Sequence, residues 1–482
     1  MTKTIMIQGT CSNAGKSLIV AGLCRILKED GYRVAPFKSQ NMALNSFITE
    51  DGLEMGRAQV MQAEACDIAP DGRMNPILLK PTSDQGSQVI VNGQVYGNMS
   101  AKEYYEKKPI FRKDIKKAFD SLAEDFDVIV IEGAGSPAEI NLRDNDLVNM
   151  GMAEMVDAPV LLVGDIDRGG VFASLAGTML LFKEEERARV KGVIINKFRG
   201  DVDILRPGLD MLEDIIHAPV AGVVPFMSLD IDDEDSLTDR FSARKGDALV
   251  DIAVIRVPRI SNFTDFNPLD SIDGIGVRYV GSVGELGNPD LIVLPGTKNT
   301  MADLLWLRQS GFEAEILKYS SRGKPVFGIC GGYQMLGQSL SDPKNMEHGG
   351  NRAGLGLLPH STIFEDEKVQ TAGQGQLSKV DGIFEELTGL NYKGYEIHMG
   401  VSEKDANIIN CGNVYGTYIH GLFDREEIAK AVAMALLKAK GLDFSNVKAF
   451  DVESYKKEQY DLLSKGLREA LDMDLIYSLI KE

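Results

Sequence analysis

The chain has 482 residues, a length that accommodates about two to four domains, each large enough to bury its own core. Hydrophobic residues make up 44% and charged residues 26% of it, as is usual for a globular protein. The formal net charge of −19 argues against a general nucleic-acid-binding or anionic-membrane surface, although a locally basic pocket is compatible with an anionic substrate.

The five cysteines lie far apart without C-x-x-C spacing, which predicts neither a disulfide framework nor a zinc site. The sequence opens directly on a strand pattern without the features of a signal peptide, and no apolar run approaches membrane-spanning length. We therefore expect a cytoplasmic protein with no nucleic-acid partner and no membrane partner.

The first motif is a phosphate-binding loop. A short strand over 4–8 is followed by the glycine-rich segment 9–17 and by an amphipathic helix with apolar residues from Leu18 to Leu27. Five residues separate the two glycines, one more than in G-x-x-x-x-G-K-[ST]. Lys16 is expected to reach the β- and γ-phosphates of ATP, and Ser17 to hold Mg²⁺. The residues assigned to the nucleotide here are Gly9, Thr10, Asn13, Gly15, Lys16 and Ser17.

Further strands continue the same domain. A strand over 32–38 leads into the amide-rich segment 39–45, which is typical of a ligand loop, and a charged surface helix is predicted over 100–125. The buried strand 126–132 ends in Glu132, which is expected to hold or orient Mg²⁺ beside the γ-phosphate; capping of the next turn is the structural alternative. Asn196 follows a late strand, where its amide is expected to contact the nucleotide base.

Strands that alternate with helices over roughly 225 residues predict a doubly wound parallel sheet. The acidic run 230–235 and the polar residues to 247 then indicate an interdomain connection. A second strand series begins at Val250, and the strand 291–294 breaks at Pro295-Gly296-Thr297. A backbone N–H near Gly296 or Thr297 is a candidate oxyanion donor.

The segment 324–337 carries the strongest sign of chemistry. Its apolar strand ends on Cys330 between glycines, and helical spacing follows, as in the G-x-S-x-G nucleophile elbow but with a thiol. A cysteine at a helix N-terminus is favoured as thiolate, and the N–H of Gly331 lies where an oxyanion would form. Cys330 is therefore predicted to be the nucleophile, with a buried structural cysteine as the alternative.

A cysteine nucleophile needs a general base, and the chain has only five histidines. His420 stands at the end of a predicted strand, directly before a glycine, which is a suitable position for the general base. His398 is the second candidate, for which lining the pocket is the favoured role.

This pairing of a P-loop domain with a Cys/His domain resembles a known family. The second half looks like a class I glutamine amidotransferase, and the whole is similar to the cobyric acid synthase family of glutamine-hydrolysing corrinoid amidotransferases. In the first half the resemblance rests on residues 8–10, 36–45, 132–142, 165–172 and 196–200, and in the second on 261–265, 328–334, 395–400 and 420–423. The first domain also looks like dethiobiotin synthetase, which shares the longer loop.

The resemblance implies two doubly wound α/β domains: a P-loop synthetase domain over 1–228 and an amidotransferase domain over 250–440, joined by a linker over 229–249 and followed by a helical tail over 441–482. It implies ATP- and glutamine-dependent amidation of the b, d, e and g carboxylates of cobyrinic acid a,c-diamide, with a protected ammonia path between the sites. The candidates for binding the substrate are Lys38, Gln40, Asn41, Arg57, Lys80, Arg143 and Arg168.

The sequence departs from the wider amidotransferase pattern at the residues that follow His420. Most amidotransferases of this class follow the histidine with Pro-Glu, and that acid orients the imidazole, whereas Gly421 and Leu422 stand here. His420 must then be oriented by another group, by a backbone carbonyl or loosely, and we expect a slower glutaminase.

Three alternatives stay open from the sequence: an enzyme of the a,c-diamide synthase type, a P-loop switch of the partitioning-ATPase type, and an interaction protein with an inert amidotransferase domain. The tail is expected to be a docking helix or an oligomer contact. The sequence leaves the oligomeric state undetermined.

Overall fold

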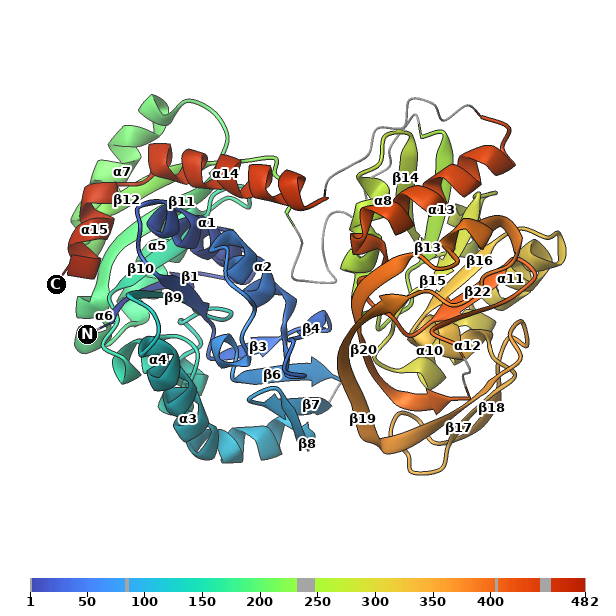
Figure 1. Ribbon diagram of the computed structural model, residues 1–482. Coiled ribbons are helices and arrows are strands. Elements are labelled where there is room, and N and C mark those ends of the chain that lie inside the picture. Colours follow the sequence, from blue (N-terminus) through green and yellow to red (C-terminus); the bar gives the residue numbers. More distant parts are fainter. Residues whose placement is uncertain (1, 83–85, 232–247, 404–405, 443–451, 482) are drawn as a thin grey trace.

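The computed structural model describes residues 2–82, 86–231, 248–403, 406–442 and 452–481, and they form two α/β domains side by side (Figure 1). Most of the predicted linker lies outside the described residues, as do residues 443–451 of the predicted tail. Each domain is built around its own parallel sheet, which confirms the predicted fold class.

The first sheet has the strand order β12-β11-β10-β1-β9-β2, with every neighbouring pair parallel. Its strands are β1 (Lys3–Gly9), β2 (Val34–Phe37), β9 (Val128–Glu132), β10 (Val160–Asp165), β11 (Val190–Phe198) and β12 (Val220–Pro225). The helices around it are α1 (Lys16–Glu29), α2 (Arg57–Ala65), α4 (Met150–Met155), α5 (Val171–Leu181), α6 (Glu184–Arg189) and α7 (Val202–Ile216).

Side chains of β1 alternate between the two faces of this sheet, as the strand period of two requires. Met6 belongs to one buried cluster, whereas Ile5 and Ile7 belong to another. Both faces are therefore apolar, and the polar end of β1 lies at the sheet's carboxyl edge, where ligands bind in folds of this kind.

A smaller sheet, β3-β6-β7-β8, extends the first domain toward the second (Figure 1). It contains β3 (Gln40–Met42), β6 (Ile77–Pro81), β7 (Gly86–Val91) and β8 (Gln94–Ser100), with the hairpin β4 (Ser46–Ile48) and β5 (Glu54–Gly56) nearby. The predicted charged helix is α3 (Ala101–Ala123), which Ser100 and Glu103 begin with a capping box.

The second sheet has the order β14-β13-β15-β16-β22-β21, parallel except for its edge strand β21. Its strands are β13 (Val250–Ile255), β14 (Ile275–Val280), β15 (Leu291–Leu294), β16 (Val326–Ile329), β21 (Ile408–Cys411) and β22 (Val414–Thr417). Its helices are α8 (Asn267–Asp270), α9 (Val283–Leu286), α10 (Thr300–Gln309), α11 (Phe312–Ser321), α12 (Gly331–Leu336) and α13 (Glu426–Ala439).

A further sheet, β18-β17-β19-β20, belongs to the second domain, and its strands β19 and β20 lie on the side that faces the first domain (Figure 1). It consists of β17 (Ser339–Asp342), β18 (Gly350–Ala353), β19 (Ser361–Gln376) and β20 (Asn391–Ser402), and its two long strands contact β4 of the first domain.

The end of the chain returns to the first domain. Helix α14 (Val452–Ala470) lies against α1 and β12, and α15 (Met473–Lys481) contacts β1, both far from α13 (Figure 1). Leu463 and Leu467 of α14 pack over Gly22 of α1, where a Cβ would lie 2.2 Å from a methyl group of Leu467. Two leucines thus replace solvent along the apolar face of α1.

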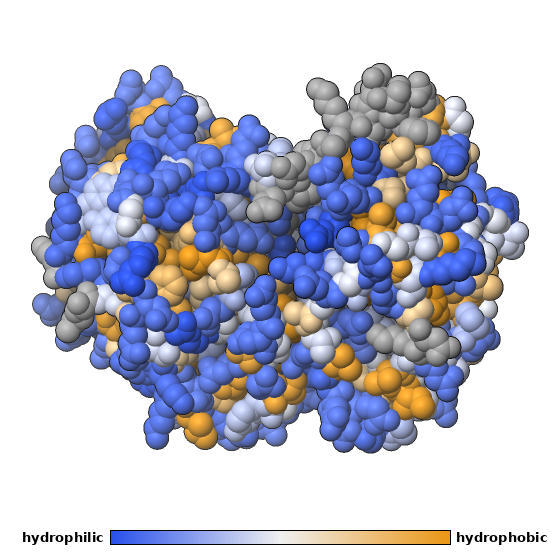
Figure 2. All heavy atoms as spheres, in the orientation of Figure 1, coloured by the Kyte–Doolittle hydropathy of each residue, from blue (hydrophilic) through white to orange (hydrophobic). Residues whose placement is uncertain are grey.

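The face of the molecule shown in Figure 2 is mostly hydrophilic over both domains, with smaller apolar groups between the polar residues. Within the described residues, every helix is too short or too polar to cross a membrane.

Candidate active sites

The P-loop joins β1 to α1 as predicted. Lys16 folds back over the loop and donates from Nζ to the carbonyl oxygens of Cys11, at 3.0 Å, and Gly135, at 3.1 Å. This path favours glycine at position 9, because a Cβ there would lie 3.0 Å from the Lys16 Nζ and would displace the lysine side chain. The ammonium is therefore held directly over the phosphate cradle.

Glu132 lies beside the loop because β9 is the parallel neighbour of β1 and both strands end at the same edge. Its Oε1 accepts from Ser17 Oγ and from Lys38 Nζ, each at 2.9 Å, and its Oε2 accepts from Gln62 Nε2 at 2.5 Å. The two side chains predicted to hold Mg²⁺ thus lie next to each other, and both offer oxygen atoms, the ligand type that this ion prefers. The contact from Gln62 was not anticipated.

Asn196 is buried behind the P-loop. Its Nδ2 donates to the carbonyl of Ala14 at 2.8 Å, and a Cβ on Gly15 would lie 2.0 Å from that nitrogen. The amide therefore braces the loop, and its contact with a nucleotide base stays a prediction. Elsewhere in the loop the Thr10 N–H donates to Val163, and the carbonyl of Asn13 accepts from Lys197.

The predicted amide-rich ligand loop uses its side chains within the protein. Gln40 accepts from the Tyr104 hydroxyl at 2.5 Å, and Asn41 donates to Gln59 at 3.1 Å. Asn45 reaches the second domain, where its Oδ1 accepts from the backbone N–H of Asn262 at 2.7 Å.

The basic substrate candidates fall into two groups. Arg168 is 60% exposed and lies 3.6 Å from Asp165, and Arg143 bonds the carbonyl of Leu181. Arg57 and Lys80 are buried instead. Lys80 lies in the wall of the cavity that contains Cys330, the predicted nucleophile.

Cys330 forms the predicted elbow between β16 and α12. Its φ of 50° and ψ of −107° are strained for a residue with a side chain. The turn tolerates only glycine at position 332, because a Cβ there would lie 1.9 Å from the carbonyl oxygen of Leu294. The strand–turn–helix geometry thus presents the thiol at the carboxyl edge of the sheet.

His420 reaches the same edge because it follows β22, the parallel neighbour of β16. Its Nδ1 lies 2.7 Å from Oδ2 of Asp265, whose Oδ1 accepts from the N–H of Gly421 at 3.0 Å. Burial lowers the pKa of His420, but the Asp265 carboxylate and the Cys330 thiol outweigh it and raise this pKa to about 10. The imidazole is oriented and held as a cation beside the sulfur.

Asp265 therefore fills the role of the acid missing after His420, and the reason for expecting a slow glutaminase falls away. It was missed as a site residue because it lies in the short turn Phe263–Phe266, not behind the histidine. A signal was available: the segment 261–265 follows strand β13, which ends at the same edge as the strands before Cys330 and His420.

The predicted oxyanion donors lie around the sulfur. Gly296 packs against His420, because a Cβ on it would lie 3.0 Å from the imidazole Cε1. A Cβ on Gly331 would lie 3.1 Å from the backbone nitrogen of Thr297, so these two N–H groups are close. Within the part of the chain that the structure describes, neither N–H donates to a protein acceptor.

His398 occupies a different position. Its Nδ1 lies 2.6 Å from the carbonyl oxygen of Gly400, and its ring stacks on Tyr418 at 3.7 Å between centroids. It lines the cavity beside Cys330. The cavity is lined by residues from both domains, namely Lys80, Ser261, Asn262, Thr297, Lys298, Thr300, Cys330, Gln334, Glu347, Lys368, Ile397, His398, Met399 and His420.

Contacts between the domains lie directly against this triad. Asn262 bonds Asn45 and Ser46, and the Tyr395 hydroxyl donates to the carbonyl of Ser46 at 3.0 Å. The Tyr395 ring stacks on His420 at 5.4 Å between centroids. The first domain thus forms part of the support of His420, the candidate general base.

A buried ionic group extends this contact. Glu54 of the first domain accepts from Lys80 at 2.9 Å, and across the boundary from Lys368 at 2.6 Å and Gln370 at 2.8 Å. Burial raises the pKa of Glu54, but the two lysines outweigh it and hold this pKa far below its ordinary value. The carboxylate stays ionised at the boundary between the two domains.

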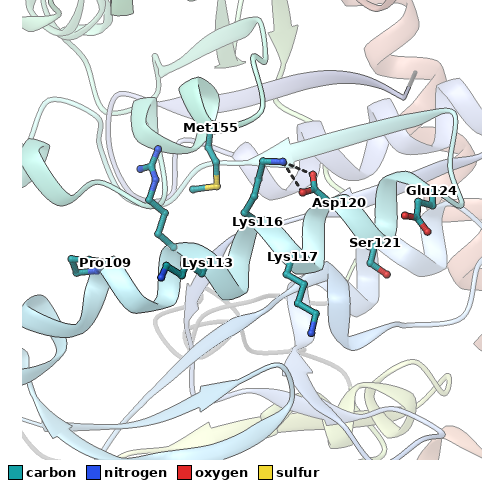
Figure 3. A pocket seen from close by; sticks show the side chains of 9 residues that line it. Pro109, Lys113, Lys116, Lys117, Asp120, Ser121, Glu124 and Met155 are labelled. Carbon is teal, nitrogen blue, oxygen red and sulfur yellow. Dashed lines mark hydrogen bonds and ion pairs between the residues drawn. The ribbon is translucent and has the colours of Figure 1, made fainter.

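A second hollow lies on the outer face of α3 and is open to solvent (Figure 3). Four of its nine lining residues are basic, and Lys116 pairs there with Asp120 at 2.5 Å. None of the residues described above for the two candidate sites lines this hollow, and we assign no chemistry to it.

Comparison with known proteins matches both halves of the chain. Residues 5–236 match the CobQ/CobB/MinD/ParA nucleotide binding domain, and residues 251–428 match the CobB/CobQ-like glutamine amidotransferase domain. Among solved structures, that of PurLQS from Thermotoga maritima is 20% identical, covers 40% of this chain and 99% of its own, and has a TM-score of 0.31.

Similarity to curated proteins extends over the full chain. The cobyric acid synthase of Ruminiclostridium cellulolyticum is 60% identical over 100% of this chain and 98% of that protein. That of Lachnoclostridium phytofermentans is 57% identical over 100% of both. The chain belongs to the cobyric acid synthase family.

Proposed function

We propose that the protein is an ATP-dependent, glutamine-hydrolysing amide ligase of cobalamin biosynthesis. It amidates the b, d, e and g carboxylates of cobyrinic acid a,c-diamide and yields cobyric acid. The observation that carries the proposal is the Cys330 elbow facing a His420–Asp265 pair at 2.7 Å, joined in one chain to a P-loop domain. Full-length similarity to cobyric acid synthases supports the choice of substrate.

In the glutaminase half, the Cys330 thiolate attacks the side-chain amide carbon of glutamine. The N–H groups of Thr297 and Gly331 receive the oxyanion, and the proton on His420 passes to the leaving ammonia. Water then attacks the thioester with His420 as base, and glutamate leaves as the thiol is restored. Asp265 keeps the imidazole oriented through both proton transfers.

In the synthetase half, an oxygen of the substrate carboxylate attacks the γ-phosphorus of ATP, and ADP leaves. Lys16 neutralises charge on the transferred phosphoryl group. Ser17 and Glu132 would hold Mg²⁺, which supplies further charge neutralisation at the phosphates. Ammonia then attacks the acyl phosphate, the amide forms and inorganic phosphate leaves.

The two halves need a protected path, because ammonia released into water is mostly protonated at neutral pH. The contact of Asn45, Ser46 and Glu54 with the second domain supports a short route along the domain boundary. If added ammonium chloride outcompetes glutamine at physiological concentrations, this route is wrong.

The test is glutamate release by the wild type and by Cys330→Ala, with and without ATP and cobyrinic acid a,c-diamide. We expect a Cys330-dependent activity that rises when both are added. Absence of Cys330-dependent glutaminase under every condition would contradict the proposal. Mass analysis of the corrinoid product, with cobyrinic acid as the competing substrate, distinguishes this activity from that of an a,c-diamide synthase.

A further inference from the structure

Two buried side chains of opposite charge type in the cavity beside Cys330 are not in direct ion-pair contact with any partner in the described residues. Lys298 and Glu347 both line it, and neither forms an ion pair with another residue of the described ranges. Buried charges are ordinarily paired, so this arrangement points to a ligand that brings both signs.

Glu347 is held in place by the loop that carries it. The Asp342 carboxylate accepts from four backbone N–H groups of that loop, including the one of Glu347 at 2.9 Å. The Glu347 Oε2 accepts from the N–H of Met301 at 2.9 Å, in the first turn of α10. The contact fixes the carboxylate at a helix N-terminus and commits only one of its oxygens.

Lys298 differs from the two other lysines of the cavity. Lys80 and Lys368 share the carboxylate of Glu54, whereas the Nζ of Lys298 donates to the neutral amide of Gln88 at 2.9 Å. Burial lowers the pKa of Lys298, and the neighbouring lysines lower it further, while burial raises the pKa of Glu347. The attraction of Lys298 to Glu54 and Glu347, and of Glu347 to Lys298, opposes these shifts only in part. Each group is therefore short of the opposite charge that would keep it ionised.

We propose that Glu347 and Lys298 bind the amino-acid head of glutamine, Glu347 taking the α-ammonium and Lys298 the α-carboxylate. Free glutamine carries these two charges on one carbon, and its amide must reach Cys330 in the same cavity. The inference rests on the proposed glutaminase. It makes these two residues the determinants that select a free amino acid over other primary amides.

The experiment compares three amides: glutamine, glutaramate, which lacks the ammonium, and 4-aminobutanamide, which lacks the carboxylate. Wild type is expected to prefer glutamine over each by a factor on the order of 100 in kcat/KM. Glu347→Gln should raise the KM for glutamine roughly 10- to 100-fold and lose the preference over glutaramate alone. Lys298→Met should lose the preference over 4-aminobutanamide alone.

Lys298→Arg, which retains the charge, should retain the wild-type preference, and the exposed Glu385→Gln serves as matched control. Alkylation of Cys330 by 6-diazo-5-oxo-L-norleucine, followed by intact mass, measures head-group binding without turnover; it should need higher reagent concentrations in Glu347→Gln. Full wild-type preferences in both Glu347→Gln and Lys298→Met would overturn this inference alone. A wild type without Cys330-dependent turnover or alkylation would overturn the proposed function with it.

Discussion

The two active sites use their polar groups in opposite ways. In the amidotransferase site Asp265, His420 and Cys330 face one another in the order that the reaction needs, before any substrate is bound. At the P-loop, Lys16 bonds backbone carbonyls, and Glu132 is bonded by Lys38, Ser17 and Gln62. The groups of the first site already face one another, whereas those of the second site are bonded to other protein groups and would have to exchange these bonds to contact a nucleotide.

The largest effect should come from removing the nucleophile. Cys330→Ala is expected to lower glutamine-dependent amidation by at least about 10⁴-fold, since the thioester cannot form. High ammonium chloride should restore product, which liquid chromatography of the corrinoid would detect. If ammonium fails to rescue the variant while ATP still binds, the two sites are not chemically separable.

Lys16→Ala tests the other site. The loss of one charge at the transferred phosphoryl group should reduce ATP-dependent amidation on the order of 10²- to 10³-fold. Basal glutaminase without ATP, measured as glutamate release, should stay within about twofold of wild type. A collapse of this basal activity would mean that the P-loop also organises the triad.

Asp265→Asn tests how strongly glutamine hydrolysis depends on the carboxylate of the triad. Loss of the orienting carboxylate should lower the kcat for glutamine hydrolysis on the order of 10²- to 10⁴-fold. The control is Asp270→Asn, in the neighbouring helix and outside the triad. A kcat equal to that of wild type would leave His420 oriented by Tyr395 and the backbone alone.

The stability of the same variant relative to wild type should depend on pH. The pKa of His420 is raised from its ordinary 6.5 to about 10, so its contribution to stability is fully present below pH 6.5 and is lost as the pH rises toward 10. The difference in free energy of unfolding between wild type and Asp265→Asn should therefore shrink over that interval. Denaturant melts at several pH values measure it, and a constant difference would contradict the raised pKa.

The smallest effect concerns the contact between the sites. Asn45→Ala leaves the buried N–H of Asn262 without its acceptor and should cost about 1–2 kcal/mol of stability. We also expect weaker stimulation of glutaminase by ATP, since Asn262 lies three residues before Asp265. The exposed Asn98→Ala is the control, and equal stimulation in both variants would remove Asn45 from the coupling.

Much of each site was predictable because its residues directly follow buried strands. Lys16, Glu132, Cys330 and His420 all come after apolar runs, and parallel strands bring such ends to one edge. For Asp265 this rule indicates only the edge of the sheet, because its segment follows strand β13. The residue arrives through a loop and a short helical turn, 155 residues before its partner, and nothing local shows which histidine it meets.

The amide-rich segment 39–45 shows a second limit. Its composition correctly marks a segment crowded with hydrogen bonds, but the partners of Gln40, Asn41 and Asn45 are other protein groups. Likewise, the leucine spacing of the tail reveals an apolar face without revealing that α1 covers it. A sequence pattern indicates that a side chain is buried or hydrogen-bonded, whereas the identity of its partner depends on the completed fold.

The return of α14 to the first domain has a consequence for synthesis on the ribosome. The face of α1 around Gly22 is covered by Leu463 and Leu467, which are translated only after the entire amidotransferase domain. The first domain thus emerges early but stays incomplete until the last residues appear, with an apolar groove open meanwhile. The first domain is therefore both the first to be synthesised and the last to be completed.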